Sequence, residues 1–249
     1  RMPVRLEHGR LHGPGVFDMK AGLVMMIHAV AALRELGLDL PADPVAFINA
    51  DEEIGSPGSQ HRLARIARGA ARAWVLEPSM GPTGKLKTAR KGIAQYTLRV
   101  TGRASHAGLA PEEGASAIHE LARIIAAVRQ LNDPARGVTV NVGVISGGTR
   151  PNVVAAHASA ELDVRVLTAE DGERIDAELR AVEPSESRLR IVLEGGFLHP
   201  PLERSSRNRR LWHRARSIGR SLGLDLDHVT AGGASDGNVT SRFTATLDG

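Results

Sequence analysis

The strongest constraint on the fold is a change in hydrophobic periodicity along the chain. Residues 94–100 and 158–166 alternate strictly between apolar and polar side chains, which predicts antiparallel strands with one solvated face. Residues 44–50 and 73–76 are short continuous apolar runs, which are typical of strands buried on both faces of a parallel sheet. The chain is therefore expected to contain two kinds of sheet.

The alternating strands belong to a segment with the element order β-α-β-β-α-β. Within it, helical spacing predicts helices over 118–128 and 169–182, and further strands are expected over 138–145 and 189–193. This order is that of a ferredoxin-like α+β domain. The flanking segments predict an α/β layer, with helices over 20–36, 59–68 and 211–222 and a strand over 224–229.

The predicted fold class is thus α/β with an inserted, smaller α+β domain. The bounds expected from the pattern are 1–89 and 200–249 for the α/β layer and 90–199 for the insertion. The chain begins at a loop and ends in a strand and turn, from which we expect a piece of a longer protein.

Composition excludes several classes of function. The chain of 249 residues has no cysteine, which excludes disulfides, thiolate metal sites and a cysteine nucleophile. The net charge of +4 comes from arginines scattered among acidic residues, so no nucleic-acid partner is expected. No apolar run reaches the ~18 residues of a membrane span, and the opening residues do not form a signal peptide. We therefore expect no membrane partner and a cytoplasmic location.

Acidic residues stand where predicted strands end or a helix begins. They are Asp18, the run Asp51-Glu52-Glu53, and Glu77. Side chains that follow parallel strands meet in the ligand crevice of an open α/β sheet, and clustered carboxylates are stabilised by a bound cation. The alternative is that Asp18 caps the following helix and the acidic run is a solvated turn.

Five ordered motifs resemble one family along essentially the whole chain, namely the dinuclear zinc exopeptidases and deacylases that include glutamate carboxypeptidase, acetylornithine deacetylase and aminoacylase. The motifs are Gly13-Pro14-Gly15-Val16-Phe17-Asp18-Met19-Lys20, Asp51-Glu52-Glu53-Ile54-Gly55-Ser56, Leu76-Glu77-Pro78, Ala104-Ser105-His106-Ala107-Gly108 and Gly232-Gly233-Ala234-Ser235-Asp236-Gly237-Asn238. The segment Pro200–Glu203 and the last motif look most like the glutamate carboxypeptidase branch.

The resemblance implies a zinc-exopeptidase-like catalytic layer and assigns roles to the acidic residues. Asp18 would bridge two Zn²⁺ ions, Glu53 would bind one and Glu77 the other, with Co²⁺ or Mn²⁺ as alternative metals. Glu52 would be the general base that takes a proton from a metal-bound water.

The inserted ferredoxin-like domain would be a lid and dimerisation domain. His106 would reach the partner's site and stabilise the oxyanion, although a surface loop histidine is the alternative. Asn152 and Arg165 match positions that bind the substrate's carboxylate or the transition state. A structural salt bridge from Arg165 to Glu161 or Asp163 is also open. The turn Gly232-Gly233 would let substrate approach the backbone closely.

The chain departs from the family pattern in its histidines. None of its ten histidines is followed by x-Asp, and no histidine follows the final Leu-Asp-Gly. Each zinc would therefore lack its histidine, and carboxylates alone make a poor zinc site. His199 precedes Pro200-Pro201, where the closest relatives are expected to have arginine, which puts the substrate side-chain preference in doubt.

Two functions follow as hypotheses. The first is a metal-dependent hydrolase that cleaves an amide bond next to a free carboxylate, as in a carboxypeptidase or an N-acyl amino acid deacylase, and that forms a homodimer through the lid. Its substrate would be a peptide or an N-acyl amino acid. The second is a truncated or degenerate, inactive family member that acts as a dimerising or ligand-binding module.

Overall fold

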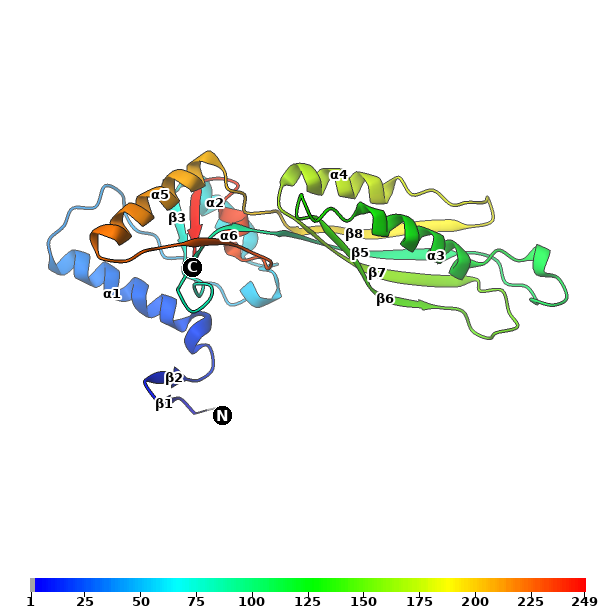
Figure 1. Ribbon diagram of the computed structural model, residues 1–249, viewed down its shortest axis with the longest axis horizontal. Helices are drawn as coiled ribbons and strands as arrows, with labels where there is room; N and C mark the ends of the chain where they lie inside the picture. Colours follow the sequence, from blue (N-terminus) through cyan, green and yellow to red (C-terminus); the bar gives the residue numbers. More distant parts are fainter. Residues whose placement is uncertain (1–2) are drawn as a thin grey trace. The chain divides into compact units, whose positions relative to one another are not determined.

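The computed structural model describes residues 3–249 and shows two compact units (Figure 1). Unit 1 comprises the described residues up to Arg90 together with Leu202–Ala231 and Ser235–Gly249, and unit 2 comprises Lys91–Pro201 and Gly232–Ala234. The sequence predicts boundaries after residues 89 and 199 and does not assign Gly232–Ala234 to the inserted domain.

Unit 1 contains a mixed four-stranded sheet. Its strands are β3 (Arg72–Val75), β4 (Leu86–Arg90), β9 (His228–Ala231) and β10 (Ala245–Asp248), in the order β3-β10-β4-β9. β10 runs parallel to β3 and antiparallel to β4, and β4 runs parallel to β9. A separate hairpin of β1 (Arg5–Glu7) and β2 (Arg10–His12) precedes the sheet.

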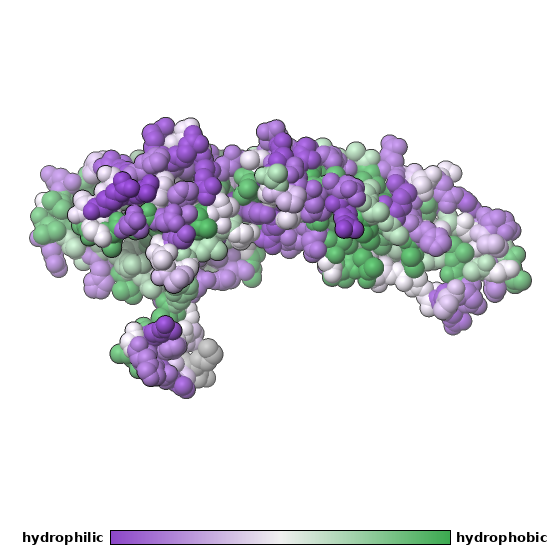
Figure 2. All heavy atoms as spheres, in the orientation of Figure 1, coloured by the Kyte–Doolittle hydropathy of each residue, from purple (hydrophilic) through white to green (hydrophobic). Residues whose placement is uncertain are grey.

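Four helices belong to the same unit. They are α1 (Ala21–Glu35), α2 (Gln60–Gly69), α5 (Ser206–Ser221) and α6 (Asp236–Thr240). Leu211 and Trp212 of α5 pack with Leu247 of β10 in a small core. The opposite surface of α5 is rich in arginine, and Figure 2 shows this region as strongly hydrophilic.

Helix α1 docks by its first turn and leaves most of its apolar side chains exposed. A Cβ at Gly22 would collide with the carbonyl oxygen of Leu76, so the helix approaches the end of β3 very closely. Met25 and Ile27 are each 62% exposed. By length and composition alone, the segment Val16–Glu35 would also qualify as a membrane span, and 6% of its most apolar 18-residue window is buried. The cytoplasmic location stays a prediction.

The predicted strand over 44–50 is wrong. These residues belong to no strand, and Val45 and Ile48 are 70% and 67% exposed. A doubly buried strand requires hydrogen-bonded neighbours and covering layers, and the described residues provide neither for this segment. β4, in contrast, is a strand that the sequence reasoning missed.

Unit 2 is the ferredoxin-like domain that the sequence predicts. Its elements in chain order are β5 (Gly92–Thr101), α3 (Ala117–Val128), β6 (Thr139–Gly147), β7 (His157–Val166), α4 (Ala169–Arg180) and β8 (Arg190–His199). The sheet order is β6-β7-β5-β8, and all neighbouring strands are antiparallel. The predicted fold class, α/β with an inserted α+β domain, is therefore confirmed.

The core of unit 2 follows the predicted alternation. Ala94, Tyr96, Leu98 and Val100 of β5 are all at most 3% exposed, whereas Gln95 and the other alternate residues point to the opposite, wetter face. Leu121 and Ile124 of α3 and Ile175 of α4 complete this core. Ser116 and Thr168 begin the two helices, because each side chain accepts a backbone N–H from its helix.

Candidate active site

Unit 1 positions the predicted acidic residues in three separate segments. Asp18 lies in the irregular turn Val16–Lys20 that leads into α1. Glu52 and Glu53 lie in a single 3₁₀ turn, Glu52–Ile54, and Glu77 follows β3 directly. Glu52 and Glu77 are half-buried, whereas Asp18 and Glu53 are exposed. Lys20 rather than Asp18 is the residue at the start of α1, and Asp18 makes no capping hydrogen bond there.

Burial and like charges raise the pKa of Glu77 to about 7. Burial is the largest cause, followed by the carboxylates of Glu52, Asp18 and Asp248, while the guanidinium of Arg90 acts in the opposite direction. Three other carboxylates therefore contribute negative potential at the position of Glu77. The charges of Glu52 and Asp18 thus act on Glu77, although the three residues come from separate segments.

The pKa of Glu52 is raised by the same kinds of effect. Burial raises its pKa most, and repulsion from Asp236, Glu53 and Asp18 adds to the rise, against the effect of Arg90. In the part of the chain that the structure describes, the Glu52 carboxylate accepts no hydrogen bond. It is thus a half-buried carboxylate that a water molecule or a substrate could use.

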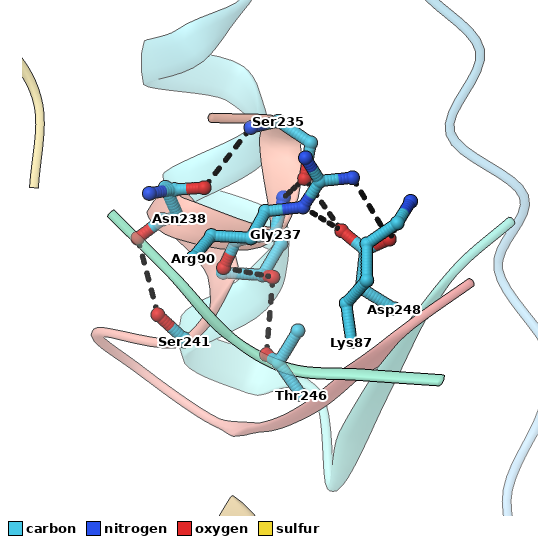
Figure 3. A network of polar contacts seen from close by, with 9 residues as sticks. Lys87, Arg90, Ser235, Gly237, Asn238, Ser241, Thr246 and Asp248 are labelled. Atoms are coloured by element: carbon cyan, nitrogen blue, oxygen red, sulfur yellow. Dashed lines mark hydrogen bonds and ion pairs between the residues drawn. The ribbon is translucent and has the colours of Figure 1, made fainter. Parts of the chain in front are cut away.

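A buried ion cluster around Asp248 lies in the same unit (Figure 3). Asp248 is 1% exposed and accepts hydrogen bonds from Arg90 Nε at 2.7 Å, from Ser235 Oγ at 2.6 Å and from Lys87 Nζ at 3.2 Å. Arg90, which opposes the raised pKa of Glu52 and Glu77, is therefore held in place by Asp248.

Sequence reasoning did not assign Asp236, Asp248 or Arg90 to the site. Asp236 was visible in the Ser-Asp-Gly-Asn motif and Asp248 in the final Leu-Asp-Gly. Nothing local in the sequence marks Arg90, because its partner Asp248 is 158 positions away.

The acidic residues do not form a complete zinc site by themselves. Zinc sites favour imidazole or thiolate ligands, and the motifs supply carboxylates alone. Among the described residues, no group of three or more His, Cys, Asp or Glu side chains is arranged to hold a metal ion. The expectation that each zinc would lack its histidine stays a prediction.

Unit 2 carries the other predicted residues on loops. His106 is exposed, and its Nδ1 accepts the backbone N–H of Gly108 at 3.1 Å. Because that nitrogen is the acceptor, the ring proton of the neutral side chain lies on Nε2. The N–H of Ala107 donates to the carbonyl of Asn152 at 3.0 Å, so the loops with His106 and Asn152 are joined by their backbones.

Arg165 has partners of its own in unit 2. Its Nε and Nη2 donate to the two carboxylate oxygens of Asp163, at 2.7 and 2.9 Å. Its Nη1 also lies 3.4 Å from the carbonyl oxygen of Gly232. The bridge to Asp163 is the structural alternative considered above. Around Gly232 and Gly233 there is open space, since a Cβ at either position would meet no atom within 4 Å.

Comparison with protein families identifies the inserted domain. Residues 88–186 match the family model described as a peptidase dimerisation domain. Over 242 residues, the chain is 28% identical to carboxypeptidase G2 of a Pseudomonas species, covering 94% of this chain and 57% of the relative. It is also 28% identical to acetylornithine deacetylase of Myxococcus xanthus, covering 75% of this chain and 52% of that protein.

Solved structures of peptidases match the chain over both units. The aminopeptidase PepT of Bacillus cereus has a TM-score of 0.82 at 26% identity, covering 99% of this chain and 67% of that one. A tripeptidase of Staphylococcus aureus shares the fold, with a TM-score of 0.77 at 23% identity. The chain thus spans little more than half the length of the curated relatives that it matches.

Proposed function

Because the chain contains a peptidase dimerisation domain and is related to carboxypeptidases and deacetylases, we propose that the protein is a metal-dependent hydrolase of amide bonds next to a free carboxylate. The observation that supports this proposal is the raised pKa of the half-buried Glu77, on which the charges of Glu52 and Asp18 act in addition to burial. Carboxylates gathered in this way are characteristic of functional sites.

Glu52 is the proposed general base. Its carboxylate is half-buried and accepts no hydrogen bond from the described residues. It can therefore take a proton from an attacking water and return it to the leaving amine, which is general acid–base catalysis by one group. Asp18, Glu53 and Glu77 are the proposed metal-binding carboxylates.

Two zinc ions are the proposed cofactors of the whole protein, with Co²⁺ or Mn²⁺ as alternatives. Since the carboxylates of the described residues are an incomplete set of zinc ligands, the proposal requires additional ligands from outside these 249 residues.

Substrate recognition is proposed for unit 2. A neutral His106 with its proton on Nε2 is a suitable donor to an oxyanion, and by the resemblance it would act in the partner's site. Asn152 and Arg165 are the proposed partners of the substrate's carboxylate, for which Arg165 would share its guanidinium with Asp163. The open backbone at Gly232 and Gly233 would line the bound substrate.

The protein is proposed to be a homodimer that associates through unit 2. Support comes from the matched dimerisation domain and from the edge strand β6, on which Val144 and Ile145 are 53% and 66% exposed. Light scattering is expected to give twice the chain mass, and Ile145→Lys is expected to give a monomer. Val24→Lys, which changes an exposed side chain of unit 1, is the control. A dimer unaffected by Ile145→Lys would exclude this edge.

The central test is hydrolysis of a panel of N-acyl amino acids by the whole protein, with and without chelator. We expect activity that chelator removes and that Glu52→Gln abolishes, while the bound metal stays unchanged. Glu112→Gln, an exposed carboxylate in unit 2, is the control. Wild-type turnover in Glu52→Gln would remove the assignment of the base. No turnover of any substrate would favour an inactive dimerising or ligand-binding module.

A further inference from the structure

The turn that carries Glu52 is tied to α6 by a network of side chains. Ser56 Oγ donates to Asp236 Oδ1 at 2.7 Å, and Asn49 Nδ2 donates to Asp236 Oδ2 at 3.0 Å. Asn49 Nδ2 also lies 3.2 Å from Ser56 Oγ and 3.0 Å from Ser59 Oγ. One carboxylate thus holds the residues before and after the turn.

A second set of hydrogen bonds closes the turn from within. The Asp51 carboxylate accepts the backbone N–H groups of Gly58 and Ser59, at 2.8 and 3.1 Å, and the Ser59 hydroxyl at 2.6 Å. The N–H of Ser56 donates to the carbonyl of Asp51 at 2.8 Å. Glu52 therefore lies between two anchored residues, Asp51 and Ser56.

The conformation of Ser56 shows that the anchoring is specific. Ser56 has a positive φ of 54° and is 1% exposed. A non-glycine residue is held in this region when its surroundings compensate the strain. Its hydroxyl bond to Asp236 is a contact that provides such compensation.

Asp236 is itself well fixed. It is the first residue of α6, directly after Ser235, whose backbone N–H and side chain form a capping box with Asn238. Ser235 Oγ also donates to the buried carboxylate of Asp248. The position of Asp236 is thereby set by the same cluster that holds Arg90.

We propose that Asp236 is a positioning residue. Through its hydrogen bonds with Asn49 and Ser56, it fixes the position of the Glu52 carboxylate relative to the reacting atoms. This inference rests on the proposed function, because it gives Glu52 the role of base. Asp236 touches no reacting group in this scheme. It acts by preventing the turn 51–55 from moving relative to α6.

The test compares Asp236→Ala, Asp236→Asn and the exchange variant Asp236→Asn with Asn49→Asp, all in the whole protein loaded with zinc. The exchange variant returns a carboxylate and an amide to the same pair of positions and keeps the net charge. Asp225→Ala, an exposed acidic residue of the same unit, is the control. Turnover of an N-acylated glutamate and amide hydrogen exchange of residues 51–56 are both measured.

We expect Asp236→Ala to lower kcat by about 10- to 100-fold, as a small misplacement of a catalytic group does. KM should stay within about twofold, because the binding of substrate is not altered. Exchange in 51–56 should become faster, and the exchange variant should restore both kcat and protection. Asp225→Ala should change neither quantity.

Two results would overturn the inference. Unchanged exchange in Asp236→Ala would show that the clamp does not hold the turn, and faster exchange with an unchanged kcat would show that the turn does not position the base. Failure of the proposed function has a different signature, because Glu52→Gln itself would then keep full turnover. Loss of activity in Glu52→Gln but not in Asp236→Ala refutes the positioning role alone.

Discussion

Replacing Asp248 by asparagine should destabilise unit 1 more than any other single change of charge discussed here. The carboxylate is 1% exposed, and the side chains of Arg90 and Lys87 that bind it are 7% and 8% exposed. Asparagine has the same size but no charge, and its amide N–H₂ group would face the N–H groups of Arg90. Two buried cations would thus lose their partner.

The magnitude follows from this burial. Removing one partner of a buried ion pair costs about 3–5 kcal/mol, because it leaves an uncompensated charge. For a unit between the 100- and 150-residue size classes this corresponds to a fall in Tm of roughly 10–20 °C. The equivalent exchange at Asp227, an exposed partner of Lys85, should leave Tm close to the wild-type value, because surface ion pairs contribute little.

Tryptophan fluorescence measures this effect in unit 1 alone. Both tryptophans of the chain, Trp74 and Trp212, lie in unit 1, and Trp212 packs against the core next to Leu247. Thermal and urea unfolding followed by their emission should show the early transition in Asp248→Asn and not in Asp227→Asn. A loss below about 1 kcal/mol would refute the reasoning, because it would equal that of an exposed pair.

Two further predictions concern other parts of the fold. Hydrogen bonds from Arg123 and Ser185 lower the pKa of Glu120 to about 2, against the effect of burial. The charge of Glu120 therefore stabilises unit 2 above pH ~4.5, and this contribution is lost as the pH falls toward 2. Glu120→Gln should therefore lower the free energy of unfolding by about 2 kcal/mol at pH 7 and by progressively less in acid, measured by circular dichroism. A loss that does not depend on pH would contradict this prediction. Gly22→Ala should cost roughly 1–3 kcal/mol in the tryptophan transition, because its Cβ would overlap the Leu76 carbonyl. Gly69→Ala, where a Cβ meets nothing within 4 Å, should be neutral, and an equal effect of the two would show that α1 does not dock through Gly22.

The ferredoxin-like unit could be predicted because its strands are marked by a pattern within each segment of the sequence. Alternation with period two assigns one face of β5 and β7 to the core, and the buried residues Ala94, Leu98 and Val164 follow it. The error at 44–50 has the opposite origin. A continuous apolar run shows that a segment can be buried, but whether it pairs depends on neighbours that its own sequence does not specify.

β4 was missed for a related reason. Its sequence is Leu-Lys-Thr-Ala-Arg, in which two cations suggest a solvated segment. Both Lys87 and Arg90 are nevertheless 6% exposed, because Asp248 on the neighbouring β10 neutralises them. Charged residues are rarely buried unless they are paired, and a pair separated by 158 positions cannot be found from local periodicity.

The candidate site shows why the acidic motifs were nevertheless informative. Like charges are expected to lie apart, yet burial together with neighbouring carboxylates raises the pKa of both Glu52 and Glu77, and the charge of Glu52 is one of the causes for Glu77. Arg90 relieves the repulsion only in part, since its guanidinium already binds Asp248. Arrangements that oppose stability are retained where function requires them. The like charges of Asp18, Glu52 and Glu77 therefore oppose the stability of unit 1 rather than contribute to it, which is why the acidic motifs point to function.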